Sequence, residues 1–145
     1  MKTKINLLAI LIILTTSVLA QNQPFRKCNT IEVVNGNLIE FIKFAQSKGY
    51  VVANYDKDLE IYKSEPFKLW KSSNHVAVIM AYKENDNLII TGTASVSFML
   101  TGANTVGKME KRGIGNMFGK AFDIINNLSV KYANKYGYEL KYLKK

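Results

Sequence analysis

Two long stretches of β-forming residues, 75–82 and 88–100, lie on either side of a short polar turn. Within the second stretch, threonine and serine alternate with glycine, alanine, valine and phenylalanine. Because successive side chains of a strand point to opposite faces of its sheet, this alternation gives one polar face and one apolar face. The two stretches therefore predict a β-hairpin within a sheet that is solvated on one side.

Helical periodicity occurs twice, once before and once after this β-rich region. Residues 37–48 begin with an asparagine cap and a glutamate three positions later, carry one apolar stripe, and end at Gly49. A second apolar stripe runs from about residue 114 to Gly137, with polar residues on the opposite side. Each amphipathic helix needs an apolar surface to cover, so both are predicted to pack on the sheet.

Shorter segments complete the predicted fold. Residues 50–54 and 59–63 flank a polar turn and predict another hairpin, and residues 138–143 alternate as a final strand does. The stretch 101–113 is glycine-rich, charged and without period, so we predict a mobile loop there and consider it the best candidate for a functional loop. The predicted class is α+β: an antiparallel sheet of about five to six strands with two helices packed on one face.

The N-terminus has the pattern of a secretory signal peptide. Lys2 and Lys4 precede an apolar run that is shorter than the roughly 20 residues needed to cross a bilayer, and Ala20 is a small residue before a polar segment. We expect cleavage after Ala20, which leaves no integral membrane span and places the protein in the periplasm or outside the cell. The expected organisation is a signal peptide at 1–20, a short leader at 21–34 whose end suits an edge strand, and a single α+β domain at 35–145.

Positive charge is distributed unevenly along the chain. After residue 20 there are 18 basic and 11 acidic residues, and six of this excess of seven fall within residues 101–145. In an exported protein, such asymmetry favours an anionic envelope lipid or polysaccharide, or an exported protein, as partner. No base-stacking aromatic motif or arginine cluster supports nucleic-acid binding. A coding bias toward lysine and asparagine is the competing explanation for the basicity.

The candidate binding residues are the basic side chains of the predicted loop and its neighbouring helix, together with the only tryptophan: Lys108, Lys111, Arg112, Lys120 and Trp70. Trp70 follows a loop marked by a proline, so we expect its ring to be partly exposed.

The glycines of residues 113–120 have the spacing neither of a phosphate loop nor of a dinucleotide-binding fingerprint. Gly115 and Gly119 instead predict a close approach of the second helix to the sheet. The alternative is an anion held by Arg112 and the start of this helix.

Catalytic and metal-binding groups are scarce. The chain has one histidine, His75, and one cysteine, Cys28, which excludes a disulfide framework, a zinc site of paired Cys and His ligands, and a two-histidine relay. Cys28 is expected to be buried and inert. Acidic residues at 56–60 and 84–87 are explained by turns, with weak calcium binding as the alternative.

No catalytic residue, metal or cofactor is therefore predicted. The expected function is binding without catalysis, through a basic C-terminal region that faces an anionic envelope component or a protein partner. One alternative is a small exported hydrolase that uses His75. Another is a protein that accompanies or inhibits a second exported protein through a free sheet edge.

Overall fold

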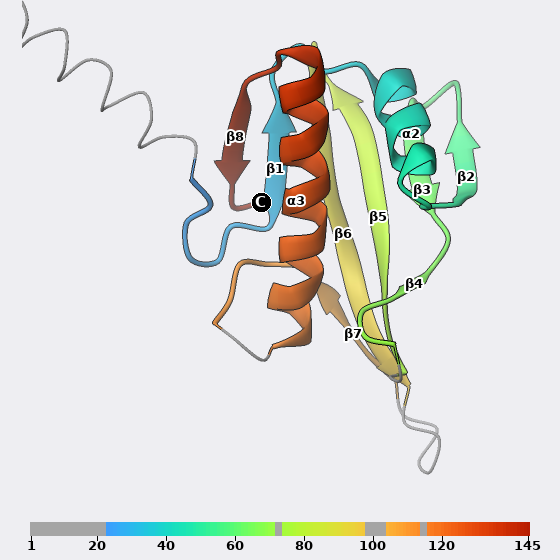
Figure 1. The fold of residues 1–145 in the computed structure, drawn as a ribbon, viewed down its shortest axis with the longest axis vertical. Coiled ribbons are helices and arrows are strands. Elements are labelled where there is room, and N and C mark those ends of the chain that lie inside the picture. Colours follow the sequence, from blue (N-terminus) through green and yellow to red (C-terminus); the bar gives the residue numbers. More distant parts are fainter. Residues whose placement is uncertain (1–22, 72–73, 98–103, 114–115) are drawn as a thin grey trace, which may run out of the picture.

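A computed structural model of the chain describes residues 23–71, 74–97, 104–113 and 116–145 (Figure 1). The predicted signal peptide lies outside these residues. Within them the strands are β1 (Thr30–Val33), β2 (Val52–Asp56), β3 (Ile61–Ser64), β4 (Phe67–Lys68), β5 (His75–Glu84), β6 (Asn87–Ser97), β7 (Asn104–Lys108) and β8 (Leu140–Leu143). The helices in the same part of the chain are α2 (Leu38–Ser47) and α3 (Met117–Tyr136).

The strands form one antiparallel sheet in the order β2-β3-β5-β6-β1-β8. Strand β4 pairs with β5 beyond the end of β3, and β7 pairs with β6 beyond the end of β1. Both helices cover the same face, α3 over β6 and β1 and α2 over β5 (Figure 1). The predicted α+β class is confirmed. The eight-stranded sheet has more strands than expected, and β1 lies inside it rather than at an edge.

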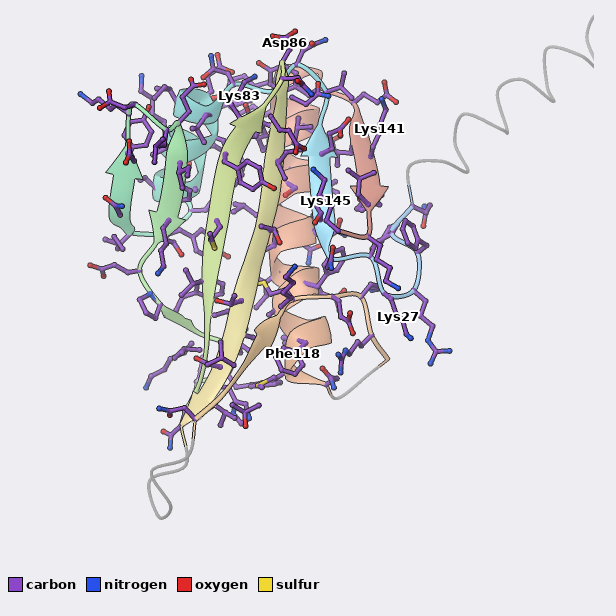
Figure 2. All side chains as sticks on the ribbon, turned by 180° about the vertical axis from the view of Figure 1, so that it is seen from behind. Lys27, Lys83, Asp86, Phe118, Lys141 and Lys145 are labelled. Carbon is purple, nitrogen blue, oxygen red and sulfur yellow. The ribbon has the colours of Figure 1, made fainter. Side chains whose placement is uncertain are left out.

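The predicted central hairpin is the longest pairing in the described sheet. Strands β5 and β6 stay in register from Glu84 opposite Asn87 to His75 opposite Val96. The residues of β6 that face the helices are buried, and those that alternate with them on the other face, Thr91, Thr93 and Ser95, are half-buried. Figure 2 looks onto that second face, which no helix covers. As the sequence predicts, the alternation along β6 gives the sheet one apolar face under the helices and one polar face that no helix covers.

The predicted caps Asn37 and Gly137 lie at the start of α2 and at the end of α3, whereas α3 begins at Met117 after the cap Asn116 and its apolar period had predicted a start at about residue 114. The side chain of Asn37 accepts a hydrogen bond from the backbone N–H of Glu40 at 3.1 Å, which satisfies one of the free amides at the start of α2. Helix α3 ends at Gly137, which adopts a left-handed conformation with φ of 76° that glycine accepts without steric cost. None of the helices in the described ranges has the length and apolar character required to cross a bilayer.

The loop expected at 101–113 is only partly a loop. Residues 104–108 form β7, which pairs with residues 93–97 of β6, whereas residues 101–103 lie outside the described part. Gly107 allows this strand to pack beneath α3, because a Cβ atom there would lie 2.6 Å from the ring of Phe118. The strand was not predicted because its single apolar residue, Val106, is 64% exposed, so it carries no apolar alternation.

Two smaller corrections concern the first hairpin and the segment that follows it. Its turn lies two residues later than expected, because the carboxylate of Asp56 accepts hydrogen bonds from the backbone N–H groups of Asp58 and Leu59 at 3.0 and 2.9 Å. Leu59 is therefore an exposed turn residue and not part of a strand. The two-residue strand β4 was not predicted, since it is too short to show a period.

Tyr62 gives the fold a defined sensitivity to high pH. The side chain is fully buried, and its hydroxyl has no hydrogen-bond partner in the described part of the chain. Burial, with a smaller contribution from Tyr50, raises the pKa of Tyr62 to about 12 from a usual value of 10.0. Between these two values the unfolded chain loses this proton and the folded chain keeps it, so stability falls as the pH rises.

We expect Tyr62→Phe to be at least as stable as the wild type at about pH 7, because it removes an unsatisfied buried hydroxyl. The variant should also lose less stability than the wild type between about pH 10 and pH 12. Urea unfolding followed by circular dichroism at the two ends of that range measures both effects. Equal losses in the two proteins would show that Tyr62 ionisation does not limit alkaline stability.

Candidate functional site

Three segments that are far apart in the sequence meet beside the N-terminal end of α3. The leader runs along the segment that follows β7: the N–H of Lys27 donates to the carbonyl of Lys111, and the N–H of Lys111 donates to the carbonyl of Cys28, both at 2.8 Å. The side chain of Asn29 donates to the carbonyl of Lys145 at 2.7 Å and accepts from its N–H at 2.9 Å. These bonds hold the leader, the segment after β7 and the C-terminus together.

Cys28 lies beneath this junction and is fully buried, as predicted. Burial raises the pKa of its thiol, and the nearby Lys111 only partly opposes that effect. A thiol with a raised pKa carries little thiolate at neutral pH and reacts slowly. Cys28 therefore packs beneath the site and does not line it.

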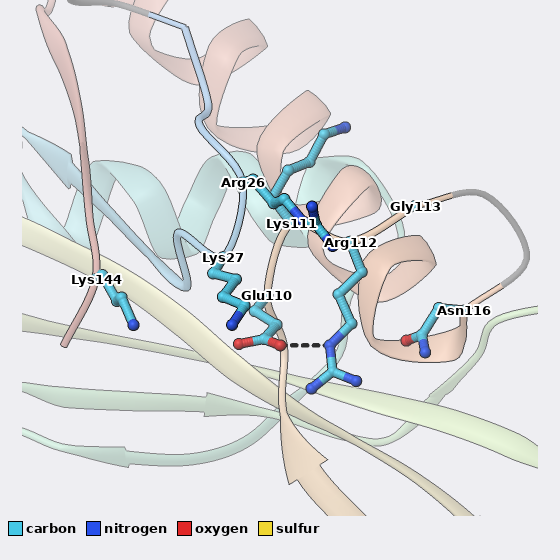
Figure 3. Close-up of a pocket in the computed structure, with 8 residues that line it drawn as sticks. All are labelled: Arg26, Lys27, Glu110, Lys111, Arg112, Gly113, Asn116 and Lys144. Atoms are coloured by element: carbon cyan, nitrogen blue, oxygen red, sulfur yellow. Dashed lines mark hydrogen bonds and ion pairs between the residues drawn. The ribbon is translucent and has the colours of Figure 1, made fainter.

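A pocket of about 630 Å³ opens where the three segments meet (Figure 3). We call it the basic pocket; its lining residues are Arg26, Lys27, Glu110, Lys111, Arg112, Gly113, Asn116 and Lys144. Five of these side chains are cationic and one is a carboxylate. That carboxylate, on Glu110, is bound to the Nε of Arg112 (Figure 3). The pocket therefore has a strong excess of positive charge.

Three of the five cations form no ion pair within the part of the chain that the structure describes. Among the described residues, no carboxylate lies within ion-pair distance of Arg26, Lys27 or Lys144. Like charges that are gathered in one concave region raise its positive potential and attract anions. The basic pocket is thus suited electrostatically to a ligand with more than one negative charge.

A second pocket of about 600 Å³ adjoins the first and shares four lining residues with it. We call it the tryptophan pocket; it is lined by Trp70, Lys111, Arg112, Gly113, Asn116, Gly119, Lys120 and Asp123. The two pockets together form what we call the basic groove.

Two of the shared side chains are held by contacts within the groove. Lys111 lies where the two pockets meet, and its Nζ donates to Asp123 at 2.7 Å. The guanidinium of Arg112 lies 5.1 Å from the ring centre of Phe118, a cation–π contact that fixes its direction.

The groove brings together four of the five predicted binding residues, Lys111, Arg112, Lys120 and Trp70. Trp70 is 37% exposed, which confirms the expectation of partial exposure. Lys108 lines neither pocket. Since its neighbour in β7, Gly107, faces Phe118 of α3, the alternation of the strand places Lys108 on the opposite face of the sheet.

Three cations of the groove were not predicted: Arg26, Lys27 and Lys144. All three lie near the ends of the described chain, where the sequence shows basic residues but no sign of what they contact. The signal that could have drawn attention to Arg26 and Lys27 is their position beside a buried cysteine. A leader that carries a core residue has to dock on the domain.

Gly119, in the first turn of α3, acts differently from the prediction. A Cβ atom on Gly119 would lie 3.3 Å from the Cβ and the carbonyl oxygen of Arg112, so Gly119 allows the helix to approach the preceding segment. Gly115 lies outside the described residues. The side chain of Asn116 accepts from the N–H groups of Phe118 and Gly119 at 2.9 and 3.4 Å, which occupies two of the amides that an anion could use. Side chains therefore supply most of the groove's capacity for anions.

His75 lies at the start of β5, half-buried, with its ring edge-on to Trp70 at 5.0 Å between centres. It does not line the basic pocket or the tryptophan pocket.

A third pocket of about 350 Å³, between the end of α2 and α3, is lined by Lys48, Tyr50, Ile124, Asn127, Leu128 and Lys131. No group of three or more His, Cys, Asp or Glu side chains in the described ranges could hold a metal ion.

No protein-family model and no curated protein sequence matches the chain. The function therefore has to be argued from the groove itself.

Proposed function

We propose that the protein is a small exported binding domain, without catalytic activity, whose basic groove holds an anionic envelope component or an acidic protein partner. One observation carries the proposal, namely that four separate segments place six cationic side chains around one groove. Those side chains are Arg26, Lys27, Lys111, Arg112, Lys120 and Lys144. Only two carboxylates, Glu110 and Asp123, line the same surface, and both are engaged in ion pairs.

The arrangement favours ligand binding over a purely structural role. A structural cation normally forms an ion pair with a carboxylate, whereas Arg26, Lys27 and Lys144 form none among the described residues. Bringing uncompensated like charges together costs free energy, and an anionic ligand recovers that cost by neutralising them. Arginine also offers a planar fork of donors that matches carboxylate and phosphate groups.

Export remains a proposal that rests on the N-terminal sequence pattern. The described chain begins at Gln23, three residues after the expected cleavage site at Ala20, and residues 26 and 27 already line the groove. Cleavage would therefore leave a new N-terminus a few residues from the binding surface. An anionic ligand outside the cytoplasm, such as an envelope lipid or polysaccharide, would then be within reach of the site.

Recovery of a partner from the cell envelope tests the proposal. The triple variant Arg26→Gln, Lys27→Gln, Lys144→Gln removes the three unpaired cations, and a matched variant, Lys43→Gln, Lys57→Gln, Lys63→Gln, removes the same charge from exposed positions outside the groove. We expect the first variant to recover at least about tenfold less partner than the wild type, and the second to recover about as much as the wild type. Mass spectrometry with lipid and glycan analysis identifies what is bound.

Salt provides a second readout of the same interaction. Exposed charge contacts are screened over about 10 Å at roughly 0.1 M ionic strength, so the partner should be released when the salt concentration is raised. Equal recovery by both triple variants would contradict the proposal. A partner that stays bound at high salt and is unaffected by the groove variant would indicate an apolar or strand-edge interface instead.

A further inference from the structure

The two halves of the basic groove differ in their chemistry. The basic pocket has five cations, no aromatic side chain and one carboxylate. The tryptophan pocket adds to the shared residues an indole ring, one further cation and the carboxylate of Asp123. One half therefore suits negative charge alone, and the other half suits a ring that carries polar groups.

Trp70 is held in place before any ligand arrives. The preceding residue, Leu69, is 5% exposed, and its N–H donates to the carbonyl of His75 at 3.0 Å. The ring of His75 meets the indole edge-on, with an interplanar angle of 84°. A fixed and partly exposed aromatic ring loses little conformational entropy on binding, which makes it an effective platform for a flat or ring-shaped group.

Asp123 and Asn116 supply the tryptophan pocket with partners for hydroxyl groups. The side chain of Asp123 is 47% exposed, and one of its oxygens accepts from Lys111, so the carboxylate retains further capacity as an acceptor. The oxygen of the Asn116 side chain caps α3, which leaves its amide NH₂ as a donor. A hydroxyl group can donate to the carboxylate and accept from the amide, whereas a phosphate or sulfate group would be repelled by Asp123.

We propose that the ligand of the groove is an anionic glycan, a sugar chain that carries carboxylate, phosphate or sulfate groups. A sugar ring stacks on Trp70, with its hydroxyls on Asp123 and Asn116, and the acidic substituents lie among Arg26, Lys27 and Lys144. This inference rests on the proposed function and narrows it to one class of ligand. It accounts for the aromatic ring and the carboxylate, which a sugar-free polyanion would leave unused.

Titration calorimetry of the full chain, expressed with its own N-terminal segment, separates the two halves of the groove. The probes are polygalacturonate as an anionic glycan, polyphosphate as an anion without sugar, dextran as an uncharged glycan, and vesicles that contain anionic phospholipid. We expect Trp70→Ala to weaken polygalacturonate binding about five- to tenfold, the loss of roughly one aromatic stacking contact, and polyphosphate binding less than about twofold. Trp70→Phe keeps a stacking ring and should retain most of the affinity.

The triple variant Arg26→Gln, Lys27→Gln, Lys144→Gln should weaken both anionic probes, and dextran should bind far more weakly than polygalacturonate. Circular dichroism of each variant checks that the fold is intact. Equal effects of Trp70→Ala on polygalacturonate and polyphosphate, or no effect on either, would overturn the glycan inference and leave anion binding standing. Vesicle binding without polygalacturonate binding would replace the glycan with a membrane surface. A failure of all four probes would overturn the glycan inference, whereas an acidic protein recovered from the envelope through the same three cations would still support the proposed function.

Discussion

Gly92→Ala is expected to lower the free energy of unfolding by about 3 kcal/mol or more, a severe effect for one methyl group. Gly92 lies on β6 opposite Ile79 of β5. A Cβ atom there would stand 2.2 Å from the backbone oxygen of Val78 and 2.6 Å from the Cε of Met109. The oxygen belongs to the neighbouring strand, so relief of the clash requires a distortion of the longest pairing in the described sheet. Urea unfolding followed by circular dichroism measures the loss.

Gly113→Ala is the matched control, because a Cβ atom at that position meets nothing within 4 Å. We expect its stability to lie within about 0.5 kcal/mol of the wild type. Gly92 also accepts a hydrogen bond at its carbonyl from the N–H of Met109 at 3.0 Å, directly before the segment that lines the groove. Gly92→Ala should therefore weaken anion binding as well as stability. A Gly92→Ala protein as stable as the control would show that the sheet relaxes around the methyl group.

Local sequence signals were sufficient to predict the elements that hold the fold together. The β-forming residues of β5, the period of two in β6, the apolar stripes of α2 and α3, and the caps at Asn37 and Gly137 all depend on residues a few positions apart. These signals also gave the α+β class and the placement of both helices on one face. The structure confirms each of them because short-range preferences and tertiary packing agree there.

Strand β7 shows where this reasoning fails. Its residues carry little apolar character, and it exists because β6 continues beyond the end of β1 and offers an unpaired edge. That edge becomes visible only when the order of the strands is known. The same error affected the site, because a loop at 101–113 would have placed Lys108 with Lys111 and Arg112, whereas strand alternation places it on the other sheet face.

The remaining part of the site depends on contacts between distant parts of the chain. Lys27 reaches the groove through its bond to Lys111, and Lys144 through the bonds of its neighbour Lys145 to Asn29. Charge counts located the basic final third of the sequence, and Lys111, Arg112, Lys120 and Trp70 came from that count and from the rarity of tryptophan. A count of charges carries no information on which chain ends dock, so the count alone did not predict Arg26, Lys27 and Lys144 as members of the site.

Tyr132 is the residue whose removal we expect to damage the fold most directly on the helical face. Its side chain is fully buried on α3, with ring centres 5.3 Å from Phe41 and 5.7 Å from Phe44 of α2. Its hydroxyl donates to the carbonyl of Asn37 at 2.8 Å and accepts from the N–H of the same residue at 3.1 Å. One side chain thus provides both the packing between the helices and a clamp on the start of α2.

Two variants separate these roles. Tyr132→Ala should lower the free energy of unfolding by about 3 to 5 kcal/mol, because it empties a large buried site between the helices and the sheet. Tyr132→Phe keeps the ring and should cost about 1 to 2 kcal/mol, since the N–H and carbonyl of Asn37 lose their partner. Tyr62→Phe, which removes a hydroxyl without a described partner, is the matched control and should cost nothing. If Tyr132→Phe were also without cost, water would replace both hydrogen bonds, and packing alone would join α3 to α2.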